Sequence, residues 1–172
     1  MISPVETSGA PSGAAENGDD ETWLARAIEV ANQNVADGGG PFGAVVVREG
    51  VEVAAAGNRV TRDLDPTAHA EVVAIRAACQ ALNTFSLAGT TLYASCEPCP
   101  LCLSAALWAR VDRVVFAADR HDAERAGFDD REFYELLERD RATWPNPVVE
   151  LRIARAGEPF EAWRAYTART PY

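Results

Sequence analysis

The sequence contains no lysine, and all 16 of its basic residues are arginine. This absence excludes enzymes that form a Schiff base through lysine and nucleotide-binding proteins that need a P-loop lysine. Positive charge is also scarce, because 26 acidic residues give a net charge of -10 and a pI of about 4.6. Nucleic-acid binding depends on clustered Arg and Lys, so we expect no nucleic-acid partner.

Long apolar runs and secretion signals are missing as well. No segment approaches the roughly 18 apolar residues of a membrane helix, and the N-terminus has neither a basic nor a hydrophobic segment. Cysteine is sparse, and three of the four cysteines cluster at Cys96, Cys99 and Cys102. Without a signal peptide this cluster indicates metal binding rather than disulfides. We expect a soluble, cytoplasmic protein without membrane contact, in which Cys79 is an inert buried residue.

The length of 172 residues suits one domain with a substantial core. Residues 1–19, rich in Ser, Pro and Gly, predict a flexible N-terminal arm, and residues 20–172 a single domain.

Hydrophobic periodicity predicts the order of helices and strands. It indicates a helix capped by Asp20 or Thr22 that ends at residues 38–40, and strands at 42–48 and 51–57 joined by a two-residue hairpin turn. After these come a helix opened by Asp65-Pro66, a strand at 90–95, a helix at 99–110 and a strand at 113–118. The remainder predicts a helix at 131–140, a fifth strand or extended arm at 148–153 and a helix at 160–168. This order predicts an α/β fold, a three-layer α/β/α domain whose mixed central sheet has helices on both faces.

A histidine and two cysteines carry the strongest chemical signal. Cys99 and Cys102 stand three residues apart at a predicted helix start, so both can bind one ion, and the helix N-terminus favours their thiolate forms. His69 supplies a third ligand of a kind that zinc prefers. Two thiolates and a neutral imidazole balance the charge of Zn²⁺ and leave a tetrahedral position for water, as in catalytic zinc sites.

Glu71 follows His69 at a spacing that places the two side chains on different faces of a regular helix. They can share one site only if the helix begins there and points its N-terminus at the metal. In that position Glu71 can take a proton from water, whose pKa zinc lowers to about 7, and pass it to a leaving group. We therefore predict that Glu71 is the catalytic acid and base.

Two alternatives to a catalytic zinc site would use the same cysteines. With Cys96 as a fourth ligand the zinc would be structural, and Glu71 would then have no task. The Cys96-x-x-Cys99-x-x-Cys102 spacing also suggests an iron–sulfur cluster, but the short interval to a fourth cysteine followed by proline is missing. Glu97, beside the cysteines, can either handle protons or orient the loop.

The pairing of His-x-Glu with Pro-Cys-x-x-Cys resembles the signature of zinc-dependent base and nucleoside deaminases. The chain resembles the cytidine deaminase superfamily, and within it the bacterial guanine deaminases of that fold. The likeness is carried by residues 65–76, 95–102, 108–110, 126–130 and 160–164, together with the final tyrosine.

This resemblance implies hydrolysis of the amino group at C2 of guanine, which gives xanthine and ammonia. It also implies a homodimer that exchanges C-terminal segments, so that the last residue of one subunit closes the pocket of the other. The matching base-recognition positions are Asn58, Asp130 and Tyr172, with Phe42 and Trp108 as apolar walls.

Simpler roles stay open for these residues: a turn for Asn58, a helix cap for Asp130, a core position for Trp108 and a frayed end for Tyr172. Other activities stay open too. Cytosine, guanosine and amino-triazine deaminases would use the same chemistry, and tRNA adenosine deaminases share the zinc signature but need a basic surface. A zinc-stabilised module without catalysis would not need Glu71.

Overall fold

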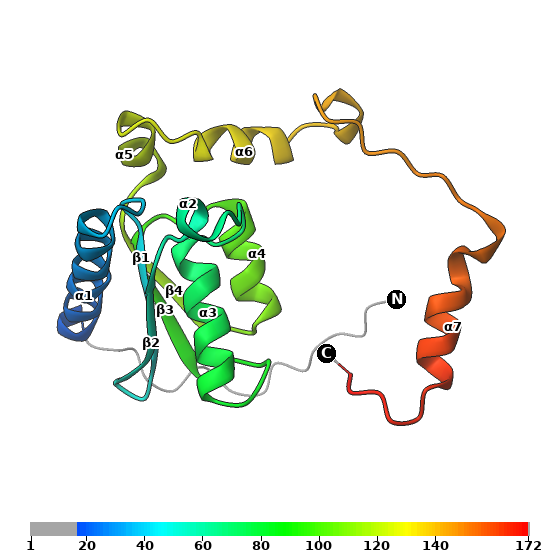
Figure 1. Ribbon diagram of the computed structural model, residues 1–172, viewed down its shortest axis with the longest axis horizontal. Helices are drawn as coiled ribbons and strands as arrows, with labels where there is room; N and C mark the ends of the chain where they lie inside the picture. Colours follow the sequence, from blue (N-terminus) through cyan, green and yellow to red (C-terminus); the bar gives the residue numbers. More distant parts are fainter. Residues whose placement is uncertain (1–16, 172) are drawn as a thin grey trace. The chain divides into compact units, whose positions relative to one another are not determined.

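The computed structural model describes residues 17–171 and divides into two compact units, with the division between Glu135 and Leu136. Residues 1–16 of the predicted arm, and Tyr172, lie outside the described residues. The first unit contains α1 (Asn17–Ala36), β1 (Gly43–Arg48), β2 (Val51–Gly57), α2 (Val60–Asp63), α3 (Ala70–Ala81), β3 (Thr90–Cys96), α4 (Pro100–Trp108), β4 (Arg113–Ala118) and α5 (Arg120–Arg125) (Figure 1). Helix α6 (Asp130–Leu137) crosses the division. The second unit has the 3₁₀ turns η1 (Arg141–Thr143) and η2 (Ala154–Gly157) and helix α7 (Glu158–Ala165).

The four strands form one mixed sheet in the order β2-β1-β3-β4. Strand β1 is antiparallel to β2 and β3, whereas β3 and β4 are parallel and are connected through α4. The β1–β2 connection has positive φ at both central residues, 52° at Glu49 and 73° at Gly50. This conformation suits the right-handed twist of a two-residue hairpin, as the sequence predicted.

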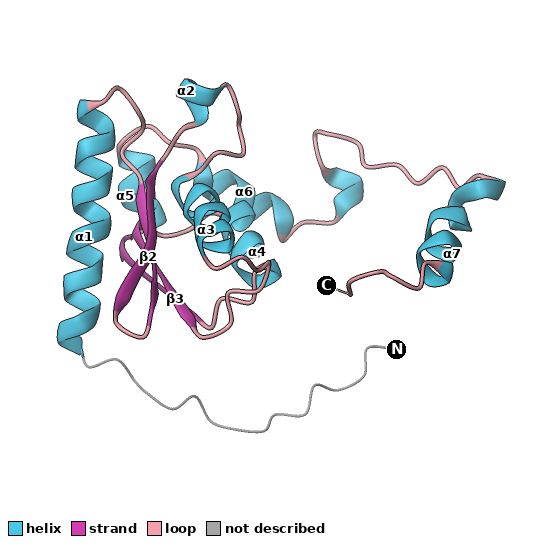
Figure 2. Cartoon of the chain, turned by 60° about the horizontal axis from the view of Figure 1, so that its bottom comes forward, coloured by secondary structure: helices cyan, strands magenta, loops and turns pink. Residues whose placement is uncertain are grey.

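Helices cover both faces of the sheet because β1 is apolar on both sides. Val45 and Val47 pack with Ala27 of α1 on one face. Ala44 and Val46 face the other way, into a cluster that α3 and α4 share. Figure 2 shows α1 on one side of the strands and α3 and α4 on the other. The predicted three-layer α/β/α fold is therefore confirmed.

The first helix begins earlier than predicted, at Asn17, so residues 17–19 are helical rather than part of an arm. Asp20 is not its cap. The Asp20 carboxylate instead accepts hydrogen bonds from both Arg113 guanidinium nitrogens, at 2.7 and 2.6 Å, and from the Tyr93 hydroxyl at 2.8 Å. This ion pair fastens α1 to β3 and β4.

The helix that carries Glu71 begins later than predicted. Asp65 accepts hydrogen bonds from the amide and the hydroxyl of Thr67, at 2.8 and 2.7 Å. This side-chain turn competes with helix formation, so Asp65-Pro66 forms a turn and α3 starts only at Ala70. His69 consequently precedes the helix instead of lying within its first turn.

Other differences concern short or terminal elements. The sequence did not predict α2 and α5, which have four and six residues. Helix α4 ends at Trp108 rather than at Arg110, which has a φ of 61°. Residues 148–153 form no strand within the described chain, so the strand predicted there is not observed. The helix predicted at 160–168 is α7, shifted toward the N-terminus.

Candidate metal centre and active site

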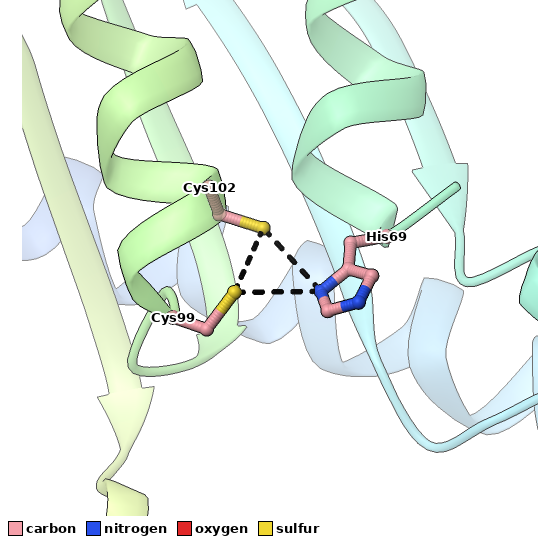
Figure 3. A group of neighbouring side chains, drawn as sticks. All are labelled: His69, Cys99 and Cys102. Carbon is pink, nitrogen blue, oxygen red and sulfur yellow. Dashed lines mark hydrogen bonds between the residues drawn. The ribbon is translucent and has the colours of Figure 1, made fainter. Parts of the chain in front are cut away.

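Two of the predicted ligands occupy the same position in two helices. His69 is the N-cap of α3 and Cys99 the N-cap of α4, both with extended backbone. An N-cap side chain commonly accepts a hydrogen bond from its own helix, but neither of these does so. Their side chains instead point toward one another and toward Cys102 (Figure 3). The N-termini of two helices therefore meet at one site.

The three ligand atoms have the spacing that a zinc ion requires. Nδ1 of His69 lies 3.5 Å from Sγ of Cys99 and 3.5 Å from Sγ of Cys102, and the two sulfurs are 3.6 Å apart. A tetrahedral ion with bonds of about 2.3 Å to sulfur and about 2.0 Å to nitrogen separates such atoms by about 3.5 to 3.8 Å. His69, Cys99 and Cys102 thus fit three corners of a zinc tetrahedron. Three protein ligands are typical of catalytic zinc sites.

The protonation of the two cysteines is coupled. The hydrogen bond between the sulfurs, followed by that with His69, lowers the pKa of Cys99 to about 4, against the effect of burial. The same sulfur–sulfur contact, together with burial and the charge of Glu71, raises the pKa of Cys102. Zinc takes thiolates as ligands, so metal binding releases any proton that either sulfur still carries.

Glu71 is the buried acid of the site. It lies in the first turn of α3 and is 8% exposed. Burial raises the pKa of its carboxyl group, and hydrogen bonds with its own backbone amide and with Cys102 oppose this shift. The contact with Cys102 places the carboxyl group beside the ligands. A carboxyl group in this environment can hold a proton and release it next to the metal.

Asn58 and Phe42 lie on neighbouring segments. The Asn58 amide N–H donates to the Phe42 carbonyl at 3.0 Å, and the Val60 amide donates to Oδ1 of Asn58 at 3.2 Å. Nδ2 of Asn58 has no hydrogen-bond partner among the described residues. The Phe42 ring packs edge-to-face on Phe128, with centroids 4.7 Å apart. The turn role of Asn58 is therefore real, and it still leaves a donor available for a ligand.

Trp108 lies on the surface at the C-terminal end of α4. It is the last residue of α4, whereas Cys102 lies in the first turn, so the two are roughly 9 Å apart along the helix axis. Trp108 is 66% exposed, and its ring lies 5.9 Å from the guanidinium of Arg110. Within one chain Trp108 is therefore not a core residue, and its role as an apolar wall stays a prediction. Asp130 begins α6, with its side chain outside the described atoms.

Cys96 makes a hydrogen bond outside its cysteine cluster. Its thiol donates to the Asp119 carbonyl at 3.5 Å. Among the described residues, the group of side chains able to hold a metal consists of His69, Cys99 and Cys102. The geometry therefore argues against a closed four-ligand site and against an iron–sulfur cluster.

Glu97 is held by Arg120, a residue that the sequence analysis did not single out. The Arg120 guanidinium binds both Glu97 carboxylate oxygens, and the Arg120 amide also donates to Oε2 at 3.0 Å. These bonds lower the pKa of Glu97. These contacts support the second of the two roles considered for Glu97, which is to orient the loop before Cys99.

Tyr134 completes the support of this loop and was also missed. The Arg120 guanidinium lies over the Tyr134 ring, 3.8 Å from its centroid, and the Tyr134 hydroxyl donates to the Pro98 carbonyl. The residues directly before Cys99 are thus held by both α5 and α6. In the sequence, only the Asp119/Asp122 capping box of α5 marks this region.

Comparison with known proteins supports the chemistry of the site. The family model of the cytidine and deoxycytidylate deaminase zinc-binding region matches residues 17–118, which include all three ligands and Glu71. The chain belongs to this deaminase family. The deaminase is 44% identical over 153 residues to guanine deaminase from Bacillus subtilis, a match that covers 88% of the chain and 98% of the relative.

Solved structures of guanine deaminases also resemble this chain. The crystal structure of guanine deaminase from Bacillus subtilis superposes on the deaminase with a TM-score of 0.85 at 44% identity, covering 88% of this chain and 98% of the other. A structure of guanine deaminase from Nitrosomonas europaea has a TM-score of 0.62 at 35% identity and covers 69% and 66%. A tRNA-specific adenosine deaminase from Aquifex aeolicus is 42% identical over 98 residues, which are 57% of this chain and 65% of that protein.

The extent of these matches matters as much as the identity. A match over 153 residues is longer than the first unit, which ends at Glu135, so it reaches into the second unit of the deaminase. The family binds zinc, and the geometry of His69, Cys99 and Cys102 fits that ion. In the described part of the chain, no helix combines the length and the apolar character needed to cross a membrane.

Proposed function

We propose that this deaminase hydrolyses guanine to xanthine and ammonia, with zinc held by His69, Cys99 and Cys102. The observation that supports it most is the match to guanine deaminase over 88% of the chain and 98% of the relative. The tRNA-specific relative matches 57% of the chain. The net charge of -10 also disfavours an RNA substrate.

Glu71 is the proton carrier in this proposal. Zinc held by His69, Cys99 and Cys102 would lower the pKa of water and so supply a nucleophile for C2 of the base. Glu71 accepts a proton from that water as the C2–O bond forms and donates it to the amino nitrogen as the C2–N bond breaks, so that neutral ammonia leaves. Burial of Glu71 supports this role, because a raised pKa lets the carboxyl group hold the proton between the two steps.

Asn58 and Phe42 are proposed to recognise the base. The unpartnered Nδ2 of Asn58 can donate to O6 of guanine, while the Phe42 ring offers an apolar face. Asp130 is proposed to accept an N–H from the imidazole half of the base. A ribose at N9 removes that donor and leaves a carboxylate without its partner, which typically costs about 1–3 kcal/mol. Free guanine is therefore preferred over guanosine.

A homodimer with exchanged C-terminal segments is proposed to complete the pocket, with Tyr172 of one subunit acting on the other. The described part of the second unit contains no buried residue. Val149 and Leu151 there are 81% and 85% exposed. Trp108, 66% exposed on the first unit, is proposed to become a wall only when a second subunit covers it. Apolar surface of this extent is typical of a protein interface.

A parallel substrate screen tests the function. Zinc-loaded protein is given guanine, guanosine, cytosine, adenosine and an amino-triazine, and ammonia release is measured for each. We expect guanine to react fastest, with xanthine formed in equal amount. A faster reaction with cytosine or the triazine would assign the chain to that substrate, and the absence of any release from guanine would reject the proposal.

A further inference from the structure

Asn34 is a buried polar residue that the zinc and proton chemistry does not use. It lies near the C-terminal end of α1 and is 7% exposed. Its Nδ2 donates to two backbone carbonyls, those of Gly40 and Asn58, each at 2.8 Å. These bonds tie the glycine segment before β1 to the residue that follows β2. A buried amide with both hydrogens engaged therefore joins two segments that are distant in sequence.

Two glycines form the space in which Asn34 lies. A Cβ at Gly39 would stand 2.4 Å from Nδ2 of Asn34, and a Cβ at Gly57 would stand 2.4 Å from its Cγ. Neither contact is sterically allowed, so a side chain at either position would displace Asn34. The backbone at Gly39 and Gly57 thus lies close to the Asn34 amide on both sides, so the Asn34 side chain has room for one conformation.

The segments that Asn34 joins carry the proposed base-recognition residues. The Phe42 amide donates to the Gly40 carbonyl at 2.9 Å, and the Asn58 amide donates to the Phe42 carbonyl at 3.0 Å. Asn34 holds the Asn58 carbonyl, and Val60 holds its Oδ1. With both of these atoms fixed, the direction of the remaining donor, Nδ2 of Asn58, is also fixed.

We propose that Asn34 is a positioning residue for substrate selectivity, which sets where Nδ2 of Asn58 stands relative to Phe42 and so favours a base with an oxygen at C6. This inference rests on the proposed function. Asn34 acts through Asn58 and touches no reacting atom. Its loss therefore weakens guanine binding more than it slows the chemistry beside Glu71.

The test compares two bases in zinc-loaded Asn34→Ala protein. We expect KM for guanine to rise roughly tenfold, which corresponds to the loss of one or two hydrogen bonds, and kcat to change less than about threefold. The inhibition constant of 2-aminopurine, which lacks O6, should change less than about threefold as well. Gln33→Ala is the matched control, because Gln33 is the neighbouring exposed amide on α1 and its side chain, among the described residues, bonds Asp37 alone.

A second pair of variants separates positioning from general damage. Gly39→Ala should raise KM for guanine as Asn34→Ala does, because its Cβ displaces the Asn34 amide. In the double variant the three Asn34 atoms nearest to that Cβ, which are Nδ2, Cγ and Oδ1, are gone, so KM should not exceed that of Asn34→Ala alone. If Asn34→Ala does not fold, Asn34→Asp serves in its place, since it keeps the volume and removes the donor.

Three results would overturn this inference. They are an unchanged KM for guanine in the folded variant, an equal loss for guanine and 2-aminopurine, and a double variant in which the two losses add. If the wild-type protein itself releases no ammonia from guanine, the proposed function fails instead. The two failures are thereby distinguished.

Discussion

Nδ1 of His69 and Sγ of Cys99 lie 3.5 Å apart, and each belongs to the residue that caps a different helix. The positive ends of α3 and α4 therefore converge where thiolate ligands and a carboxylate gather. Each helix terminus stabilises a nearby anion by about 0.3–1 kcal/mol. This arrangement also explains how Glu71, two residues after a ligand, can lie beside the metal.

Cys99 and Cys96 should differ sharply when each is replaced by alanine. Cys99→Ala removes a ligand and should leave less than about a tenth of the zinc bound per chain after dialysis, because two protein ligands hold zinc poorly. Cys96→Ala should keep one zinc per chain, because its sulfur points to Asp119. Metal analysis of both proteins checks this, and zinc loss in Cys96→Ala would restore the four-ligand site.

Glu71→Gln should keep zinc and lose turnover by at least roughly a hundredfold, the range for removal of a general acid and base. The buried amide avoids the desolvation of a carboxylate, so thermal unfolding should occur at the same or a higher temperature. Glu29→Gln, an exposed position on α1, is the matched control. Retained turnover in Glu71→Gln with full zinc occupancy would remove this residue from the mechanism.

Glu97→Gln should destabilise the protein in a pH-dependent way. Arg120 lowers the pKa of Glu97, so the folded state favours the charged form and gains stability above the ordinary pKa of 4.5. At pH 7 the variant should lose roughly 1–3 kcal/mol in unfolding free energy, because Arg120 no longer faces a carboxylate at position 97. The loss should disappear as the pH falls through the lowered pKa. Urea unfolding with a chelator present measures both, and a pH-independent difference would contradict the ion pair.

Gly43→Ala should disrupt the contact between α1 and the sheet. A Cβ there would stand 2.3 Å from the Ala27 carbonyl oxygen, and backbone atoms cannot yield as a flexible side chain does. We expect a loss of roughly 1–3 kcal/mol in unfolding free energy, as for other overpacked cores. Gly157→Ala, whose Cβ would come no closer than 4.0 Å to Glu161, should change stability little. Equal effects of both substitutions would show that α1 does not pack as described.

Local sequence patterns were sufficient to predict the β1–β2 hairpin and helix α3. The continuous apolar run of β1 and the Glu49-Gly50 turn identified the hairpin, and the apolar stripe of α3 identified that helix. The predicted start of α3 was wrong because the Asp65 side chain accepts a hydrogen bond from the Thr67 amide and holds a turn there. Hydrophobic periodicity does not reveal such a side-chain bond. Helices as short as α2 and α5 complete too few turns to show a pattern.

The metal ligands could be predicted because their chemistry depends on residue type and spacing. The contacts that hold Glu97 and its loop could not be predicted. They come from Arg120 and Tyr134, which lie on helices that only the tertiary fold brings to this loop. The exposure of Trp108 could not be predicted either, because it depends on how α4 packs. Asn34 shows the same limit, because an asparagine on a helix becomes informative only when the carbonyls it contacts are known.

The central claim is tested most directly by ammonia release from guanine with wild-type and Glu71→Gln proteins, each carrying one zinc per chain. The account predicts that the wild-type protein forms xanthine and ammonia in equal amounts, while Glu71→Gln forms almost none. Zinc-loaded wild-type protein that leaves guanine unchanged, or a Glu71→Gln protein that matches it, would contradict the account.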